Sequence, residues 1–412
     1  MPSRPKPKKT SNMKKYMMMV LAAALCCTTT STMAGTPNNV LARISDEKAP
    51  KVLTAGEVSE YEHTLLAEWK DSVKTALLPA YHNKILRIDT IVMPLDWRIY
   101  IDNSVNNGDH ALYISLHGGG GGPSRMNDSQ WENQKRLYRP KNAVYLCPRA
   151  IEDVWNMHFL PETDEFYRRI IMMAEAFFDV DPNKVYILGY SAGGDGVWRM
   201  GPRMADTWAA ASMMAGHPGD VSLVNLRNLP FMIWCGELDA AYDRNKRCQE
   251  RIDELGKLHS ADPEGYVFEG HIVKGKGHWM DNEDNAAIEW MAKYKRNPYP
   301  KKIVWRQEEV TERHFYWLSA PVNELERGKE VIATFNGNTI NIEKCDYTSL
   351  TLSLNDKMMN LDSPVTVVYK GKNVFKGKVE RRSDVLRTTL YSRNDPAYMF
   401  PVQIRVNLAS IK

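Results

Sequence analysis

Between Ala111 and Tyr294, short apolar runs alternate with amphipathic stretches, and this alternation limits the chain to a small set of folds. The apolar runs have the length and composition of strands at 111–116, 143–147, 184–188, 209–215, 231–235 and 266–273. Helical spacing of apolar residues occurs at 59–84, 164–178, 192–200, 241–258 and 283–294. Strands separated by helices need right-handed crossovers, which produce a mostly parallel sheet covered on both faces. We therefore predict a doubly wound α/β domain over residues 61–298.

The pattern changes at Pro298 and Pro300. Beyond them, apolar and polar residues alternate between turn signals, as in EVIATF-NGN-TINIE, and no helical spacing is evident. We predict a small C-terminal all-β domain over residues 301–412, with a core of its own. The hydrophobic segment HFYWLSA just after the joint favours a module that covers an apolar edge of the larger domain. Binding of a polymeric substrate is the alternative role.

The first 34 residues have the pattern of a secretory signal peptide. A basic stretch is followed by an apolar run from Tyr16 to Cys27 and by the small-residue site Thr32-Met33-Ala34. The run is too short to cross a bilayer as a helix, and no later stretch is apolar enough. We predict export, a linker over 35–60 and no transmembrane segment; lipid attachment at Cys26 or Cys27 is the weaker alternative.

Charge and cysteine usage exclude other classes of function. The net charge of +4 comes from six basic residues in 1–34, which leave −2 for the remainder, so a nucleic-acid partner is not expected. Cys147, Cys235, Cys248 and Cys345 have neither zinc-type nor disulfide-framework spacing. Cys147 and Cys235 lie in strand-like runs, which favours buried thiols over a bridge. No HExxH or paired CxxC occurs, and we expect no metal and no cofactor.

Two glycine-rich segments follow predicted strands. Gly189-Tyr190-Ser191-Ala192-Gly193 lies between the strand KVYIL and a helix, where two glycines permit a turn tight enough to expose the serine oxygen. His117 and the five glycines 118–122 follow the strand ALYISL, and their N–H groups are able to turn towards a developing oxyanion. Taken singly, the first is also explained by a simple turn and the second by a flexible loop.

Together, HGGG followed downstream by GxSxG resembles the oxyanion loop and nucleophile elbow of the α/β-hydrolase superfamily. The resemblance covers about 250 residues and leaves out the first 60 residues and the β module. It implies Ser191 as nucleophile, and an oxyanion hole formed by the N–H groups of Gly118, Gly119 and Ala192.

The resemblance also implies an acid and a histidine after the serine, each on a loop that leaves a strand. Asp239 follows PFMIWC with the spacing Gly-x-x-Asp, and is preferred over Glu237 and Asp243. His278 follows the strand YVFEGHIV and is the implied base. The remaining candidate histidines fit structural positions: His259, His271 and His314.

The loops at the same sheet edge offer pocket candidates. They read RMNDSQWENQ and PRAIEDVWNMHF, and Trp131, Trp155 and His158 are placed to line an acyl or alcohol pocket. An equally good interpretation is that the tryptophans cap the core. Asp195 fits a role in bracing the start of the helix, and the short stretch between Gly216 and Leu229 leaves no room for a large lid.

Within the superfamily, the elbow and the five-glycine loop are similar to those of secreted bacterial carboxylesterases, polyhydroxybutyrate depolymerases, feruloyl esterases and prolyl-oligopeptidase-type catalytic domains. We predict an exported serine hydrolase of carboxylic esters, acting on a small-molecule or polysaccharide-linked ester such as an acyl or feruloyl group. A peptidase is the alternative of the same mechanism, and it is disfavoured because there is no room upstream for a propeller and no evident acidic cluster. A non-catalytic binding protein is the alternative of another class.

Overall fold

The structure, a computed structural model, describes residues 50–101 and 109–411. The predicted signal peptide, the cysteines of the lipid alternative and the linker up to residue 49 lie outside the described residues. Among the helices of the described ranges, none is both long enough and apolar enough to cross a membrane.

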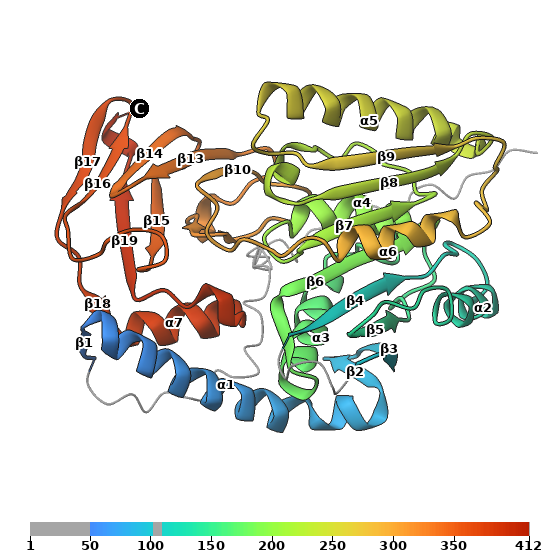
Figure 1. The fold of residues 1–412 in the computed structure, drawn as a ribbon, viewed down its shortest axis with the longest axis horizontal. Helices are drawn as coiled ribbons and strands as arrows, with labels where there is room; N and C mark the ends of the chain where they lie inside the picture. The colour runs from blue at the N-terminus through green and yellow to red at the C-terminus, as the bar shows by residue number, and fades with distance from the viewer. Residues whose placement is uncertain (1–49, 102–108, 412) are drawn as a thin grey trace, which may run out of the picture. The chain divides into compact units, whose positions relative to one another are not determined.

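An eight-stranded sheet forms the centre of the fold, in the order β2-β3-β5-β4-β6-β7-β8-β9 (Figure 1). Its strands are β2 (Ile85–Ile88), β3 (Ile91–Ile99), β4 (His110–Leu116), β5 (Ala143–Pro148), β6 (Val180–Tyr190), β7 (Ala210–Met214), β8 (Phe231–Gly236) and β9 (Phe268–Val273). In this order the six strands from β5 to β9 are parallel to one another, whereas β3 is antiparallel to β5 and β2 is antiparallel to β3. The predicted mostly parallel sheet is confirmed.

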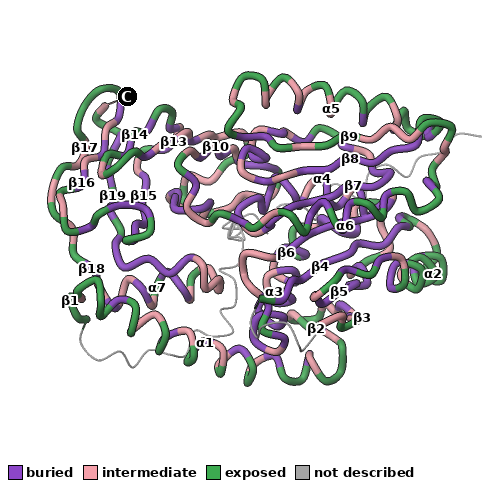
Figure 2. The backbone as a smooth tube through the Cα atoms, in the orientation of Figure 1, coloured by how far each residue is buried: buried purple, intermediate pink, exposed green. Residues whose placement is uncertain are grey.

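Successive residues of the central strands enter two different apolar clusters. In β4, Leu112 and Ile114 belong to one cluster and Tyr113 to the other. In β5, Leu146 and Tyr145 divide in the same way. Side chains alternate between the two faces of a strand, so both faces of this sheet must be covered. Figure 2 shows the central strands buried.

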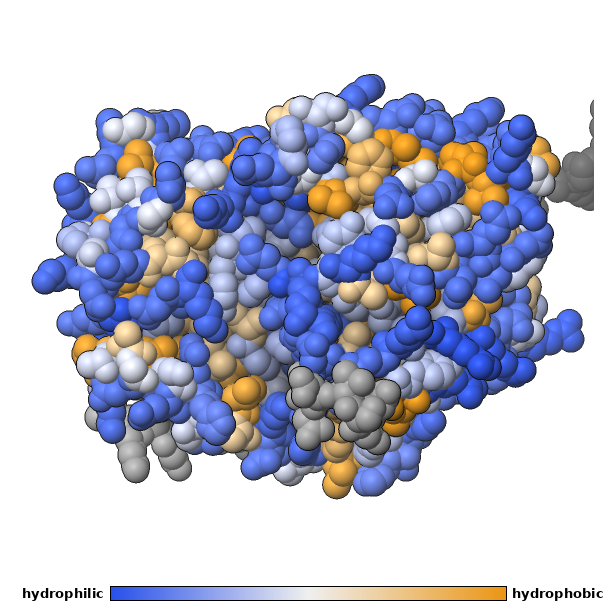
Figure 3. Space-filling model, viewed as in Figure 1, coloured by the Kyte–Doolittle hydropathy of each residue, from blue (hydrophilic) through white to orange (hydrophobic). Residues whose placement is uncertain are grey.

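Helices cover both faces. The larger cluster includes residues of α1 (Ala55–Asn83), α3 (Thr163–Phe177), α4 (Ala192–Arg203) and α5 (Arg244–Ala261). The other cluster includes residues of α6 (Ala286–Met291), and Trp131 of α2 (Ser124–Gln134) packs against it. The face shown in Figure 3 is mostly hydrophilic, with apolar residues in small groups. Short 3-10 turns connect the elements: η1 (Val224–Asn228), η2 (Ala241–Asp243) and η3 (Glu283–Asn285).

Some elements differ from the predictions. Helix α1 begins at Ala55 rather than Ser59, because Thr54 and Glu57 form a capping box, so the end of the predicted linker belongs to this helix. The segment 125–134, which we predicted as a loop, lies in α2. This helix has few apolar residues, so it leaves no periodic signal in the sequence. The expected positions of the other predicted elements agree with the structure to within a few residues.

The C-terminal part contains two further sheets. Strands β10 (Lys302–Arg306), β13 (Glu330–Asn336), β14 (Thr339–Cys345), β16 (Val365–Tyr369) and β17 (Lys372–Gly377) form the first, in that order. The second contains β11 (His314–Phe315), β12 (Leu318–Ser319), β15 (Ser349–Leu354) and β19 (Val402–Asn407). Short turns η4 (Val322–Glu324), η5 (Pro396–Tyr398) and η6 (Ala409–Ile411) complete it. The predicted β-strand character is confirmed.

This part also contains a helix that the pattern did not indicate. Helix α7 (Ser383–Arg393) packs against α1, and Arg387 forms an ion pair with Glu68 at 2.9 Å. A two-residue strand, β1 (Val52–Leu53), pairs with β18 (Arg381–Arg382), so the start of the described chain is tied to its last part (Figure 1). The C-terminal part is therefore not purely β.

The expectation of a separate C-terminal core is wrong. Buried apolar residues of α1, α3 and the central sheet form one continuous cluster with those of the C-terminal sheets. The segment 314–320 lies at this junction, as predicted. The Tyr316 hydroxyl donates to the carbonyl of Ala205 at 3.1 Å, and the Tyr316 N–H donates to Asp206 at 3.2 Å. An alternating strand pattern indicates that one face is buried but not which element covers it, which is why the sequence could not predict a shared core.

Polar contacts also join the two parts. Arg296 forms an ion pair with Asp395 at 2.6 Å, and Arg203 forms one with Glu309 at 3.2 Å. The carboxylate of Asp206 is bonded to Arg393, and its carbonyl accepts from Tyr398 at 2.6 Å. Buried arginines are costly unless they are paired, so these contacts require both parts to be in place.

Candidate active site

Ser191 lies between the end of β6 and the start of α4. Its backbone has φ 58° and ψ −119°, a sparsely populated conformation that costs about 1–3 kcal/mol. The N–H of Ser191 donates to the carbonyl of Met214, and the N–H of Asp195 donates to the carbonyl of Ser191, both at 2.9 Å. The strain is thus held by hydrogen bonds on both sides of the residue, at the carboxyl edge of the parallel sheet.

The two glycines of the pentapeptide are required by close backbone contacts. A Cβ atom on Gly189 would lie 2.3 Å from the carbonyl oxygen of Gly193. A Cβ atom on Gly193 would lie 2.1 Å from the carbonyl oxygen of Leu116. Neither position can hold a side chain without moving strand or helix backbone, so the glycine spacing is explained by the tight turn.

The structure brings Ser191, His278 and Asp239 together. Nε2 of His278 lies 2.9 Å from Oγ of Ser191, and Nδ1 lies 2.8 Å from Oδ2 of Asp239. The three residues follow β6, β9 and β8, whose carboxyl ends share one edge of the sheet. This geometry permits proton transfer from the serine hydroxyl to an imidazole that a carboxylate orients.

The rivals of Asp239 have other partners. Glu237 is exposed and accepts the N–H of Gly275 at 2.8 Å, and Asp243 is exposed and pairs with Lys246 at 3.1 Å. Asp239 is buried. Burial tends to raise its pKa, but hydrogen bonding and positive charge from His278 and Arg244 outweigh that effect and hold the pKa below its ordinary value. The residue is therefore a carboxylate at neutral pH.

Two buried histidines orient the first peptides of the glycine loop. Nε2 of His117 accepts the N–H of Ala150 at 3.0 Å, so its proton is on Nδ1, which donates to the carbonyl of Gly118 at 2.7 Å. Nε2 of His158 donates to the carbonyl of His117 at 2.8 Å. In a trans peptide the N–H points opposite to the carbonyl. The N–H groups of Gly118 and Gly119 are therefore turned away from the histidines.

Both backbone hydrogen-bonding groups of the next glycine, Gly120, are bonded to a side chain. The amide of Asn127 in α2 accepts the N–H of Gly120 at 3.0 Å and donates to its carbonyl at 2.9 Å. Gly118 lies close to Ser191, since a Cβ atom on it would be 3.4 Å from the serine Cβ. Ala192 is the first residue of α4, where an N–H has no intrahelical partner. These contacts favour Gly118, Gly119 and Ala192 over Gly120 as donors to an oxyanion.

The neutral state of the two loop histidines has a clear cause. Burial lowers the pKa of His117 to about 4, and burial also holds the pKa of His158 well below its ordinary value. The rings meet edge to face with centroids 4.7 Å apart. Protonation of His117 would remove the acceptor for the Ala150 N–H, so the loop geometry depends on both rings staying neutral.

The pocket candidates occupy different environments. Trp155 is 65% exposed, and its backbone lies beside Gly120 and Gly121 of the glycine loop. Trp131 donates its indole N–H to the carbonyl of Cys147 at 3.0 Å, which corresponds to the capping alternative. His158 is 1% exposed and supports the glycine loop, so it does not present a surface to a ligand.

Sequence reasoning missed three residues. The Tyr190 hydroxyl donates to the carbonyl of His278 at 2.6 Å, Arg244 donates to Asp239 at 2.7 Å, and Asn127 holds Gly120. Tyr190 occupies a variable position of the pentapeptide, and Arg244 and Asn127 lie in polar helical segments. No local pattern distinguishes such residues from ordinary surface ones.

Other sequence expectations concern the remaining histidines and cysteines. His271 stacks on Trp234 with centroids 4.0 Å apart, and His259 bonds to the carbonyl of Gly265 at 2.7 Å. His314 bonds to Ser319 at 2.7 Å. Cys147 and Cys235 are buried free thiols, which confirms the prediction for these two residues.

No protein-family profile and no curated protein matches the sequence. Solved structures align with part of it. A thermostable esterase aligns at 19% identity over 52% of this chain and 62% of its own, less than two thirds of its length, with a TM-score of 0.40. FphF, the fluorophosphonate-binding serine hydrolase F of Staphylococcus aureus, aligns at 15% identity over 50% of this chain and 96% of its own, with a TM-score of 0.38. A ferulic acid esterase aligns at 17% identity over 50% and 94%, also with a TM-score of 0.38.

At such identities and TM-scores the likenesses carry no argument about activity. The strand order, the parallel strands from β5 to β9 and the turn at Ser191 define the architecture by themselves. The chain has an α/β-hydrolase fold with additional C-terminal sheets.

Proposed function

We propose that the protein is a serine hydrolase that cleaves carboxylic esters through an acyl-enzyme. One observation carries the proposal: the hydrogen-bonded series Ser191–His278–Asp239 beside a glycine loop whose N–H groups face away from its anchoring histidines. Nucleophile, base, orienting acid and oxyanion donors then lie within one site, as acyl transfer requires.

The reaction follows from this geometry. Nε2 of His278 takes the proton of Ser191 as Oγ attacks the ester carbon, and the carbonyl oxygen becomes an oxyanion. The N–H groups of Gly118, Gly119 and Ala192 stabilise this oxyanion. When the intermediate collapses, the protonated imidazole gives its proton to the departing alcohol oxygen, which leaves an acyl-serine. Water then attacks the acyl-serine with His278 again as base, and the acid product and free serine are released.

The substrate proposal rests on how open the site is. The His278 side chain is 45% exposed, and Trp155 and Trp279 are 65% and 50% exposed. Large aromatic side chains left in water around a reactive group are typical of a binding surface. We propose a small-molecule ester or an ester on a larger carrier such as a polysaccharide, with Trp155 contacting it. Peptide hydrolysis is the alternative within the same mechanism.

Export remains part of the proposal. It rests on the basic and apolar pattern of residues 1–34 and on the small-residue site at Thr32-Met33-Ala34. Mass spectrometry of the protein isolated from its host tests it: a mature chain that begins at Gly35 is expected. A chain that retains residues 1–34 would contradict export by this route, and a lipid-modified cysteine would favour the anchored alternative.

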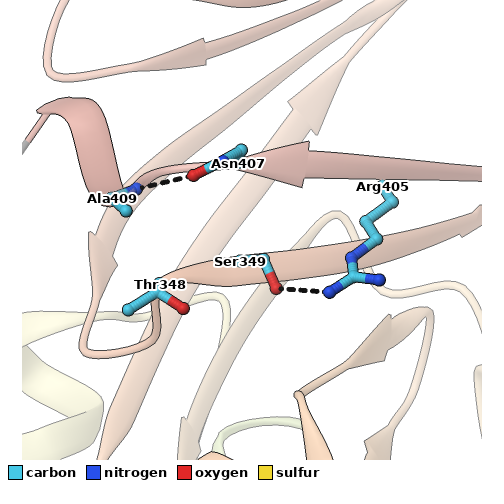
Figure 4. Close-up of a pocket in the computed structure, with 5 residues that line it drawn as sticks. All are labelled: Thr348, Ser349, Arg405, Asn407 and Ala409. Carbon is cyan, nitrogen blue, oxygen red and sulfur yellow. Dashed lines mark hydrogen bonds between the residues drawn. The ribbon is translucent and has the colours of Figure 1, made fainter.

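The C-terminal part has one feature that a polymer-binding role could use. A hollow of about 370 Å³ on the sheet of β15 and β19 is lined by Thr348, Ser349, Arg405, Asn407 and Ala409 (Figure 4). The guanidinium of Arg405 donates to Ser349 at 3.5 Å, at the limit of a hydrogen bond. The contacts of Tyr316 with the larger part instead favour a structural role for the C-terminal part.

A fluorophosphonate probe tests the proposed function, because it labels only an activated serine. We expect a single label on Ser191, no label on Ser191→Ala, and a loss of at least about 10³-fold in kcat for that variant. A panel of nitrophenyl esters and chromogenic aminopeptide substrates then distinguishes an esterase from a peptidase. A folded wild-type protein that no probe labels would favour the non-catalytic alternative.

A further inference from the structure

We propose that Arg244 is a positioning residue of the Ser191–His278–Asp239 series, which shares the Asp239 carboxylate with His278 and thereby lowers the pH at which the site becomes active. The inference rests on the proposed function. Arg244 acts only through Asp239 and His278, and it would set the acid limit of activity rather than take part in a bond-making step.

The two carboxylate oxygens of Asp239 are divided between two donors. Nδ1 of His278 lies 2.8 Å from Oδ2, and Nη1 of Arg244 lies 2.7 Å from Oδ1. The same Nη1 is 3.3 Å from Nδ1 of His278. Nδ1 of His278 and Nη1 of Arg244 both donate to the Asp239 carboxylate. Because they lie so close to each other, a permanent cation stands next to the imidazole. Asp239 therefore balances one positive charge even before His278 is protonated.

The position of Arg244 is otherwise unfavourable. It is the first residue of α5, where the helix carries partial positive charge, and its side chain is only 9% exposed. Its Nε has no hydrogen-bond partner in the described structure. A buried guanidinium at a helix N-terminus is costly unless a carboxylate compensates it. Asp239 is the carboxylate that does so, which ties the residue to the site rather than to the surface.

Other charged groups surround the pair on neighbouring elements. From α4, Asp195 lies close enough for its charge to interact with Arg244 and His278; burial raises the pKa of Asp195 to about 6. From the loop after β7, burial and the charge of Arg244 lower the pKa of His217. Tyr190 of β6 packs edge to face on His278, with ring centroids 6.0 Å apart.

More distant cations also act on this region. They are felt at His217 and belong to α4 and α5: Arg199, Arg247 and Arg251. Arg199 and Arg251 are bonded to partners outside the site, at Asp220 and Glu254. Arg244 is thus the cation in direct contact with the carboxylate that orients the base.

The direction of the effect follows from charge. A cation 3.3 Å from an imidazole nitrogen disfavours the protonated ring, and it also reduces the net attraction of Asp239 for that proton. The acid limit of activity then lies at a lower pH than it would if His278 faced an unshared carboxylate. Without Arg244 we expect this acid limit to lie at a higher pH.

The test compares Arg244→Gln and Arg244→Lys with the matched control Arg247→Gln, which changes an exposed arginine three residues along the same helix. Two profiles against pH are measured: kcat/KM on a nitrophenyl ester, and the rate of fluorophosphonate labelling. We expect the acid limb of both profiles to move up by about one pH unit in Arg244→Gln, and by a few tenths at most in Arg244→Lys. Arg247→Gln should leave it unchanged.

A uniform loss of rate with an unmoved acid limb in Arg244→Gln would overturn the proposal, since that is the result of a simple brace. If the glutamine variant does not fold, Arg244→Met replaces it as the uncharged variant: an acid limb about one pH unit higher supports the role of charge, and the wild-type acid limb contradicts it. Failure of the proposed function is distinct, because the wild-type chain would then remain unlabelled at every pH.

Discussion

The hydroxyl of Tyr190 donates a hydrogen bond to the main-chain carbonyl of His278 at 2.6 Å, and it accepts the N–H of Met280 at 3.2 Å. The residue before the proposed nucleophile therefore holds the loop that carries the proposed base. This link is independent of the contact between Ser191 and His278. It fixes the backbone of His278 relative to the residue that precedes Ser191.

Tyr190→Phe removes both hydrogen bonds but keeps the ring. We expect kcat to fall by about tenfold, because small displacements of a base are costly in proton transfer, with little change in KM. The measurement is steady-state kinetics with thermal melting as the check of folding. Tyr294→Phe is the control, because Tyr294 packs against the same apolar cluster to which Tyr190 belongs. Unchanged kcat in a folded Tyr190→Phe would show that this bond is not needed.

Asp239→Asn should be far more damaging than Glu237→Gln or Asp243→Asn. Of these three carboxylates, only Asp239 is bonded to Nδ1 of His278, and an amide there favours the wrong tautomer, which reduces kcat by about 10⁴-fold. Because Glu237 and Asp243 are exposed, the variants Glu237→Gln and Asp243→Asn should lose less than about tenfold in kcat. The three variants are compared on the same ester. A larger loss for Glu237→Gln would mean that the acid is misassigned.

Activity should rise with pH through one ionisation near neutrality, as expected for a reaction that uses a neutral histidine as its base. Asp239 does not limit this rise, because its pKa lies below the ordinary value and the carboxylate is already charged. Chelators should have no effect on the rate. The profile of kcat/KM from pH 4 to 9, with and without EDTA, is the measurement. A strong loss with EDTA that metal ions reverse would contradict the mechanism.

Glu308 should make the protein less stable as pH rises. Burial raises its pKa from 4.5 to about 7, and its Oε1 has no hydrogen-bond partner in the described structure. The native state keeps this proton after the unfolded chain has lost it, so the free energy of unfolding falls between about pH 4.5 and 7. Glu308→Gln should remove at most about 3 kcal/mol of that fall. Urea unfolding at pH 5 and pH 8 measures this change, and Glu250→Gln, at an exposed residue, is the control. If the free energy of unfolding depends on pH in the same way in the two variants, the prediction is contradicted.

Ending the chain at Asn297 should give an aggregating or poorly folded protein. The truncation exposes the cluster that the two parts share, and it removes Arg393 from Asp206 and Asp395 from Arg296. Size-exclusion chromatography and ester hydrolysis are the measurements. A soluble truncated chain with full activity on small esters but none on a polymer would instead favour substrate binding by the C-terminal part.

The residues of the candidate site differ in how far sequence could predict them. Ser191, Asp239 and His278 each follow the end of an apolar strand, and parallel strands place such positions at one edge. The proposed oxyanion loop was visible as a run of glycines. Asn127, His158 and Arg244 were not assigned these roles, because their hydrogen-bond partners are distant in the sequence or share no local pattern with them.

Helices α2 and α7 and the shared core belong to what sequence did not predict. The apolar side chains of the C-terminal strands were read correctly as buried, but burial against the larger part was not foreseen. Hydrophobic periodicity measures how a segment divides between interior and solvent, and it holds no information about the partner surface.

By itself, the sequence determined the alternation of strands and helices and the glycines without which the turn at Ser191 cannot form. Those features depend on interactions within a few residues, and they are therefore written locally. Tertiary structure alone decided that Arg244 reaches Asp239, that two neutral histidines orient the glycine loop and that the C-terminal sheets complete the core of the larger part. Each of these depends on contacts between segments far apart in the chain, where geometry rather than local pattern selects the partner.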